Sequence, residues 1–150
     1  MVLKMYDFAY EEEIKDRSYE SIFIGEKESV TKQITSEDVV TFASITDDKN
    51  PLHLDDRFAQ KSIFKKRIVH GMLSGSLISA VLGTKLPGIN TIYMSQNLKF
   101  LAPAYMGDIL TATVEVIEKK DEKKILILHT MVTNQFNEKL VEGQAVVKKL

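Results

Sequence analysis

Cysteine is absent from this sequence of 150 residues, so the chain has no disulfide, no thiol nucleophile and no cysteine-ligated metal site. The same absence agrees with a reducing compartment, and we expect a cytoplasmic protein. An excess of either charge is also missing, because 20 basic residues oppose 21 acidic ones and the formal net charge is −1. This balance does not favour nucleic acid or an acidic membrane surface as a partner.

Long hydrophobic runs are missing as well. No segment approaches the ~20 apolar residues that a membrane-spanning helix needs, and we expect no membrane partner. Residues 1–17 contain no apolar run typical of a signal peptide. They mix aromatic with acidic residues without a period, so we interpret them as an N-terminal arm that packs on the body or on a partner subunit, or as a mobile terminus. Residues 18–150 then form one domain, in keeping with the length of the chain.

The sequence does contain one helix that is apolar nearly all round. Residues 71–85 read GMLSGSLISAVLGTK, and their polar positions are mostly small serines, a pattern typical of a buried helix. Before it, residues 20–34 are predicted to form one strand or a bent pair that is interrupted at Gly25, and a helix is predicted whose N-cap is Thr35 or Ser36. Alternating apolar and polar residues predict further strands over 91–101, 109–118, 125–133 and 140–149. Because a buried helix must be enclosed, we predict an α+β fold in which a strongly curved antiparallel sheet wraps around the helix.

An acid and a histidine, Asp48 and His53, flank the turn in the segment DDKNPLH. Pro51 disfavours helical angles at Asn50, so this turn is expected to be rigid. Histidine titrates near neutral pH, and a nearby carboxylate can orient a water molecule or accept its proton. Together the two residues form a candidate general acid/base pair, which typically contributes ~10²–10⁴-fold in rate. The alternative is that Asp48 caps the turn and that His53 is an ordinary packed or exposed histidine.

Gly71 lies at the predicted start of the buried helix. Its backbone N–H has no partner within the helix and lies at the positive end of the helix dipole. Because glycine lacks a side chain, a substrate carbonyl oxygen can approach this N–H closely. Gly71 is therefore a candidate oxyanion hole for a developing enolate. The alternative is a glycine that is needed only for the turn into the helix.

Other kinds of site find less support in the sequence. His53, Asp55 and His70 could ligate zinc, but their spacing matches no regular ligand pattern, and we expect no metal. The predicted strand over 125–133 holds His129, which we interpret as a packed or hydrogen-bonded residue. No serine of the buried helix sits in a G-x-S-x-G turn, and the sequence has no glycine-rich phosphate loop.

A combination of motifs is more specific than any of these residues alone. The chain contains ITDDKNPLHLDDRFA, then RIVHGM, then GSLISAVLGTKLPG and YMSQNLKFLAPAYMGD. From about Ile22 to its C-terminus it resembles the R-specific enoyl-CoA hydratases of the MaoC-like dehydratase family. The resemblance implies a hot-dog fold for residues 18–150, with the antiparallel sheet wrapped around the helix at about 71–85.

The resemblance also implies roles for individual residues. Asp48 and His53 correspond to the family's catalytic pair. Gly71 corresponds to the glycine whose amide binds the thioester carbonyl. Asn50 falls in the turn that sets the geometry of the pair. Ser79 matches a serine near the reacting centre, and Leu82 lies where the family's acyl pocket is lined.

The implied reaction is the reversible addition of water to a trans-2-enoyl-CoA, which gives (R)-3-hydroxyacyl-CoA and needs no cofactor. We therefore expect a hydro-lyase of fatty acid metabolism that binds acyl-CoA and forms a homodimer or a higher homo-oligomer. Three alternatives stay open: a (3R)-hydroxyacyl-[acyl-carrier-protein] dehydratase, a hot-dog thioesterase and a non-enzymatic acyl-binding subunit. The basic run of Lys65, Lys66 and Arg67 suits either the phosphates of CoA or the docking of a carrier protein.

Overall fold

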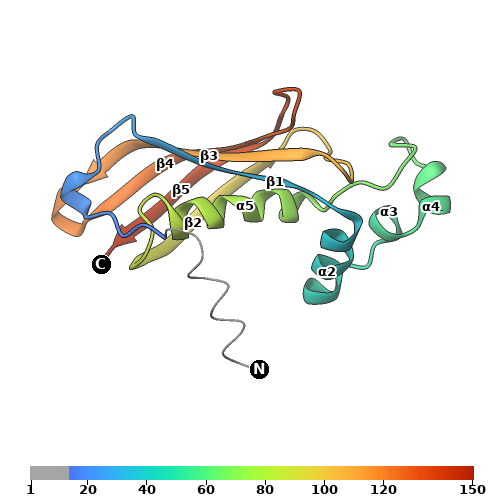
Figure 1. Cartoon of the computed structure of the whole chain (residues 1–150), viewed down its shortest axis with the longest axis horizontal. Coiled ribbons are helices and arrows are strands. Elements are labelled where there is room, and N and C mark those ends of the chain that lie inside the picture. The colour runs from blue at the N-terminus through green and yellow to red at the C-terminus, as the bar shows by residue number, and fades with distance from the viewer. Residues whose placement is uncertain (1–13) are drawn as a thin grey trace.

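The computed structural model describes residues 14–150, whose arrangement is shown in Figure 1. A 3-10 turn, η1 (Tyr19–Ser21), and strand β1 (Lys27–Gln33) lead into the helices α2 (Ser36–Thr46), α3 (Pro51–Leu54) and α4 (Asp56–Gln60). The remaining elements are α5 (Gly71–Thr84), β2 (Thr91–Phe100), β3 (Ile109–Lys120), the turn η2 (Asp121–Lys123), β4 (Ile125–Thr133) and β5 (Lys139–Lys149). No helix within the described part of the chain is long and apolar enough to cross a membrane.

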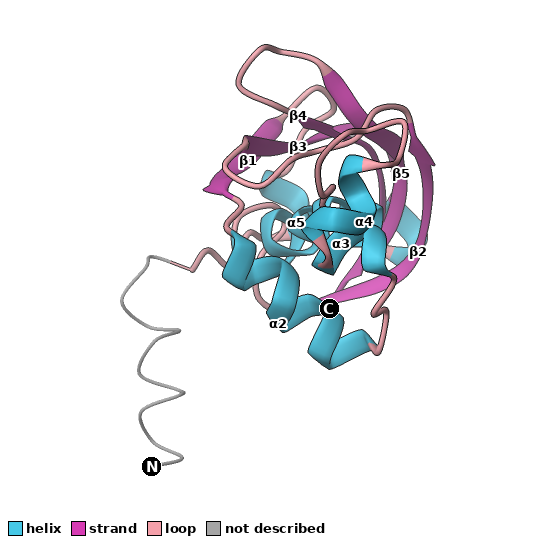
Figure 2. Ribbon diagram, turned by 90° about the vertical axis from the view of Figure 1, so that its right-hand side faces the viewer, coloured by secondary structure: helices cyan, strands magenta, loops and turns pink. Residues whose placement is uncertain are grey.

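The strands form one antiparallel sheet in the order β1–β3–β4–β5–β2. Seen from the end of the molecule, this sheet curves around α5 (Figure 2). Helices α2, α3 and α4 lie together beyond the N-terminal end of α5 (Figure 1). The predicted fold, an antiparallel sheet wrapped around a central helix, is confirmed, and the helix ends at Thr84.

The core lies between α5 and the concave face of the sheet. Strand β4 alternates strictly between buried and partly exposed residues, and in β3 every second side chain from Leu110 to Val116 is buried, so these side chains enter the core. From α5 the core receives Leu77, Ile78, Val81 and Leu82, all of them at most 9% exposed. The apolar pattern of both elements therefore determines which faces meet.

Strand β1 is shorter than the segment over 20–34 that the sequence predicted to be extended. The expected strand over 20–34 begins only at Lys27, because η1 and a tight turn occupy the residues before it. Gly25 in this turn has φ +93°, a backbone conformation that other residues rarely adopt. The β-branched residues Ile22 and Ile24 thus belong to the turn region, and Ile22 enters the core from there.

The predicted N-terminal arm, residues 1–17, is described only from residue 14 onward. Its described end packs on the loop that follows α5: Lys15 N–H donates to Thr84 O, and Arg17 N–H donates to Pro87 O, each at 2.9 Å. Asp16 forms an ion pair with the buried ammonium group of Lys149. The rest of the predicted arm lies outside the described residues.

Strand β2 and the neighbouring side of α5 form an exposed surface of apolar and small residues. Here β2 is an edge strand of the sheet, with only β5 beside it. The exposed side chains include Met72 (58%), Tyr93 (40%) and Met94 (52%). We call this the α5/β2 surface; a cavity on it is lined by Met72, Gly75, Ser76, Ser79, Tyr93, Met94, Ser95, Gln96 and Leu98.

Candidate active site

Helix α2 leads the chain to Asp48. Its first turn is fixed by the predicted cap, because Thr35 Oγ1 accepts the Asp38 N–H at 3.1 Å and Asp38 Oδ2 accepts the Thr35 N–H at 2.9 Å. The helix ends at Asp47, whose φ of 63° is left-handed. Asp48 follows directly in an exposed loop, and its side chain is 51% exposed. A short, well-defined helix thus places an acidic side chain at the edge of a cavity.

Asn50 fixes the turn between Asp48 and His53. Its Oδ1 accepts the Leu52 N–H at 3.0 Å, and its own N–H donates to Asp48 Oδ1 at 3.3 Å. Pro51 then begins the single turn of α3, a position where proline costs no hydrogen bond. The predicted break at Asn50–Pro51 is therefore a helix start, with Asp48 outside the helix and His53 within it.

His53 is held in one orientation and is 9% exposed. Its Nδ1 lies 2.7 Å from Ile68 O, so this nitrogen carries the hydrogen and donates it. In the neutral ring, Nε2 is then the nitrogen without a hydrogen, and it can accept a proton. His53 lines the same cavity as the Asp48 carboxylate. The two groups therefore have the geometry of an acid/base pair.

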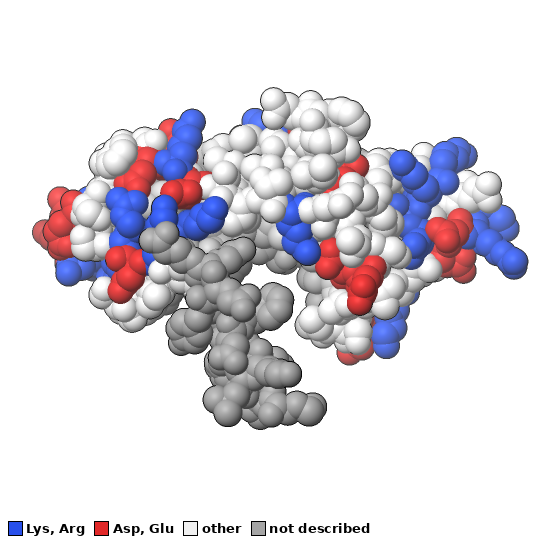
Figure 3. Space-filling model, in the orientation of Figure 1, with Lys and Arg blue, Asp and Glu red and all other residues white. Residues whose placement is uncertain are grey.

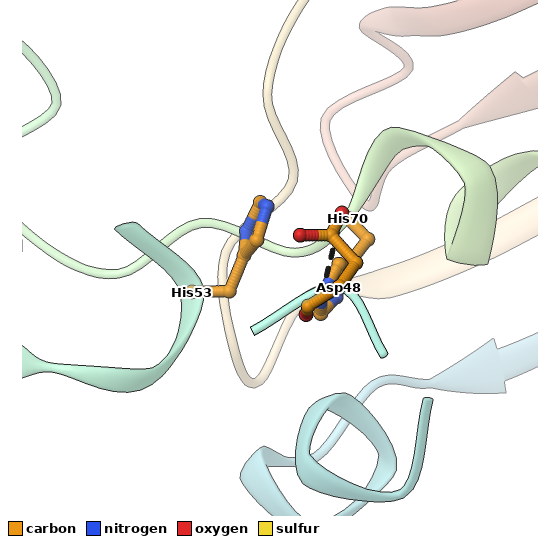
Figure 4. Close-up of side chains that lie close together, drawn as sticks. All are labelled: Asp48, His53 and His70. Atoms are coloured by element: carbon orange, nitrogen blue, oxygen red, sulfur yellow. Dashed lines mark hydrogen bonds and ion pairs between the residues drawn. The ribbon is translucent and has the colours of Figure 1, made fainter. Parts of the chain in front are cut away.

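The structure adds His70, which the sequence indicated only as a possible metal ligand (Figure 4). Its Nε2–H donates to the backbone oxygen of Asp48 at 3.0 Å. Its ring stacks on that of His53, with centroids 3.8 Å apart and planes 28° apart. Burial lowers the pKa of His70, since a charged ring would lose its water there. A neutral histidine thus joins both members of the predicted pair.

Gly71 is the first residue of α5, directly after His70. The N–H groups of Leu73 and Ser74 donate to His70 O, whereas no hydrogen bond to the Gly71 N–H is found among residues 14–150. A Cβ atom at Gly71 would come within 2.7 Å of the Phe100 ring. The glycine therefore serves the close packing of Phe100 and also leaves a free donor at the positive end of the helix dipole.

These groups share one cavity of about 490 Å³. We call it the first cavity; its lining includes Asp48, His53, Gly71, Met72 and Phe100. Much of the remaining lining is apolar, from Phe64, Ile68, Val69, Leu101, Ala102, Pro103 and Val141. Such a cavity can hold an acyl chain while a few polar groups act on one end of it.

The structure does not bring all the predicted residues into this cavity. Ser79 lines a second cavity of about 400 Å³ on the α5/β2 surface, and the two cavities share Met72. Leu82 is 1% exposed in the core and lines neither cavity. The substrate-binding roles of Ser79 and Leu82 stay predictions.

The zinc alternative from the sequence included Asp55, and the structure gives this residue another task. Its carboxylate accepts the N–H groups of Arg57 and Phe58 at the start of α4. Within residues 14–150, the side chains close enough to share a metal ion are instead Asp48, His53 and His70. His129, interpreted as packed or hydrogen-bonded, lies in β4 and bonds to Glu142 Oε1 at 2.9 Å.

The chain is similar to several known proteins. The family model of the MaoC like domain matches residues 24–139. An (R)-specific enoyl-CoA hydratase of Rhodospirillum rubrum is 45% identical over 129 residues, which are 86% of this chain and 89% of that protein. A mitochondrial 3-hydroxyacyl-[acyl-carrier-protein] dehydratase of Arabidopsis thaliana is 34% identical over 125 residues, which are 81% of this chain and 74% of that protein.

The fold is shared with a solved structure. The (R)-hydratase of Aeromonas caviae, described as involved in PHA biosynthesis, matches with a TM-score of 0.85 and 42% identity, and the match covers 87% of this chain and 98% of that one. Family, fold and motif combination thus agree over most of the chain. The chain belongs to the MaoC-like domain family.

Proposed function

We propose that this protein is a hydro-lyase that adds water reversibly to trans-2-enoyl-CoA and forms (R)-3-hydroxyacyl-CoA. The observation that carries the proposal is the first cavity, which is lined by Asp48, His53 and Gly71, the last with an N–H that has no partner among residues 14–150. The 45% identity to an (R)-specific enoyl-CoA hydratase supports the same reaction. The names of the other similar proteins also agree with acyl-thioester chemistry.

Gly71 would act on the carbonyl group of the thioester. Its N–H can donate to the carbonyl oxygen, and the dipole of α5 adds positive potential at the same point. Both favour the negative charge that develops on this oxygen when the enolate forms. The polarised carbonyl withdraws electrons from the double bond, so the β-carbon becomes open to attack by water.

Asp48 and His53 would hold and activate that water. The lone pair of His53 Nε2 or the Asp48 carboxylate takes a proton while the water oxygen bonds to the β-carbon. A proton returns to the α-carbon on the same face, so the sum of the steps is the addition of H and OH. Because interacting groups share their protons, the acid and the base are not assigned to single residues. The reaction needs no cofactor.

The basic side chains near the cavity bear on the choice between CoA and a carrier protein. In Figure 3, Lys and Arg gather at the end of the molecule where Figure 1 places α3 and α4. Arg67 is not free for substrate, because its guanidinium bonds to Asp56 and Ser36 at 2.9 Å. Lys65 and Lys66 are exposed and follow Phe64, which lines the first cavity. We propose that they meet the phosphates of CoA.

A second copy of the chain would cover the α5/β2 surface. An unpaired edge strand can extend a sheet into a partner, and exposed apolar patches mark association sites. Since Met72 borders both cavities, a partner at this surface would also close over the first cavity. We therefore propose a homodimer. A cytoplasmic location stays a prediction from the sequence.

The proposed reaction is tested with the enoyl chromophore of crotonyl-CoA. Addition of water removes its absorbance, and an (S)-specific 3-hydroxyacyl-CoA dehydrogenase should produce no NADH from the product. Faster turnover of the matching carrier-protein thioester would favour the dehydratase. Release of free thiol would favour a thioesterase, and binding without any absorbance change would favour an acyl-binding subunit.

A further inference from the structure

The proposed mechanism leaves His70 without a task, although it contacts both proposed catalytic residues. The side chain is 2% exposed, so bulk water does not reach it. It donates its Nε2–H to the backbone oxygen of Asp48 at 3.0 Å and lies flat on the His53 ring. Phe42 packs against its ring as well, at 4.9 Å between centroids. His70 is thus fixed by α2 and α3, the two elements that flank the loop of Asp48.

The contact with Asp48 holds an otherwise exposed loop to the body of the protein. All residues from Ser44 to Pro51 are exposed, and the other bonds of Asp48 are local, to Thr46 Oγ1 and to the Asn50 N–H. His70 lies 22 positions away in the sequence and is buried. Its bond therefore helps to fix the position of the Asp48 carboxylate in the wall of the first cavity.

The contact with His53 restricts the other half of the pair. The stacked rings leave His53 no room to rotate on the side of His70, while the bond to Ile68 O holds Nδ1 on another side. Together they keep Nε2 directed away from both contacts. Asp48 and His53 thus keep their relative position through one shared neighbour.

The hydrogen bonding of His70 also fixes its form. Since Nε2 donates, Nδ1 of the neutral ring has no hydrogen, and it is buried without a hydrogen-bond partner among the described residues. Protonation would place a second N–H there with no acceptor. The ring faces His53 and Asp48, and burial lowers its pKa, which disfavours a positive charge beside the proposed pair. A side chain that only filled space would not need this donor.

We propose that His70 is a positioning residue, whose hydrogen bond to the Asp48 backbone and contact with the His53 ring set the water-binding geometry of the pair. The inference rests on the proposed hydratase function. It concerns the chemical step, because His70 lies in the wall of the first cavity beside this pair, but its side chain is only 2% exposed and offers a bound acyl chain almost no surface. A displacement of the catalytic groups by about 1 Å is sufficient to reduce a rate ~10²-fold.

Three substitutions separate the hydrogen bond from packing. His70→Gln keeps an N–H donor at the reach of Nε2, and His70→Met has a similar length and shape without a donor. His70→Phe keeps a stacking ring without a donor and removes the unpartnered Nδ1. His129→Gln, at the histidine on the outer face of β4, is the matched control. For each protein, kcat and KM for crotonyl-CoA and the melting temperature are measured.

We expect His70→Phe and His70→Met to lower kcat about 10- to 100-fold, with KM within about threefold of wild type. His70→Gln should exceed His70→Met in kcat about tenfold, and His70→Phe should melt no lower than wild type. A kcat of His70→Phe within twofold of wild type would overturn the inference, as would equal kcat for the Gln and Met variants. If His70→Phe does not fold, the comparison of kcat between His70→Gln and His70→Met still tests the inference. If wild type hydrates crotonyl-CoA and the His70 variants do so equally fast, this inference alone is overturned. If wild type does not hydrate crotonyl-CoA, the proposed function is overturned as well.

Discussion

Replacement of Gly71 by alanine adds a single methyl group where the thioester carbonyl is proposed to bind. A Cβ atom at this position would lie 2.7 Å from Cδ1 and 2.9 Å from Cε1 of Phe100, so the ring must move. Phe100 is 53% exposed and lines the first cavity, which gives its ring space to turn. The methyl group and the displaced ring would then both crowd the Gly71 N–H.

The expected effects on stability and on rate differ in size. Alanine in a helix gains ~0.5–1 kcal/mol over glycine, whereas overpacking costs ~1–3 kcal/mol. The net loss should not exceed about 2.5 kcal/mol, or about 5–10 °C in melting temperature for a chain of this length. Loss of one oxyanion donor lowers kcat ~10²–10³-fold, equivalent to about 3–4 kcal/mol. We therefore expect a folded protein that hydrates crotonyl-CoA at least a hundredfold more slowly.

Gly75→Ala distinguishes the chemical effect from packing. Its Cβ would meet Leu98 Cδ1 at 2.9 Å, a similar conflict one helical turn further along α5. This variant should lose similar stability and keep kcat within about tenfold. Gly83→Ala, whose Cβ would meet nothing within 4 Å, shows the effect of alanine alone. Crotonyl-CoA turnover by Gly71→Ala within threefold of wild type, or an equal loss in Gly75→Ala, would refute the role of the Gly71 N–H.

Three further predictions concern the surroundings of the site. Burial lowers the pKa of His70 below its usual 6.5, so the unfolded chain takes up a proton first as the pH falls below about 6.5. The free energy of unfolding should therefore decrease below that pH and be unaffected by His70 above it. This is contradicted if, in urea titrations, the free energy of unfolding of His70→Phe decreases at low pH as much as that of wild type. The double variant Lys65→Gln/Lys66→Gln should raise KM for crotonyl-CoA about 3- to 10-fold with kcat unchanged, because it removes the charges proposed to meet the CoA phosphates. KM for crotonyl-pantetheine should stay constant, and the same double change at Lys123 and Lys124 is the control. Met94→Lys should convert the proposed homodimer to monomers in sedimentation experiments, because it places a charge on the α5/β2 surface, whereas Phe136→Lys in the exposed β4–β5 hairpin should not; two dimeric variants would argue against this surface as the interface.

The fold follows from patterns that are local in the sequence. The alternation in 109–118 and 125–133 and the apolar helix at 71–85 predicted a sheet around a helix, and the structure has both. Of the strand or bent pair expected over 20–34, only the part from Lys27 onward is a strand. β-Branched side chains at Ile22 and Ile24 suggested a strand there, but the left-handed turn at Gly25 separates them from β1.

The site was predictable only where its residues form a motif. Asp48, His53 and Gly71 occur in a recognisable order, and the structure places them around one cavity. The task of His70 was not predictable, because it depends on a hydrogen bond across 22 positions and on a stacked ring. Phe100 approaches from β2, whose position beside the start of α5 is set by the sheet.

The positions of Ser79 and Leu82 show a second limit of the sequence. The helix α5 is apolar nearly all round, so its pattern does not tell which side faces the sheet and which faces a partner. In the structure Leu82 faces the core, and Ser79 lies on the α5/β2 surface.

Hydration of crotonyl-CoA across a double-mutant cycle tests the central claim most directly. Asp48→Asn removes the charge of the carboxylate, and His53→Asn keeps an N–H donor for Ile68 O while it removes Nε2. We predict that each variant lowers kcat by ~10²–10⁴-fold with an unchanged melting profile. The double variant should be little worse than either, because the two groups act as a unit. Near-wild-type turnover by both single variants would contradict the account.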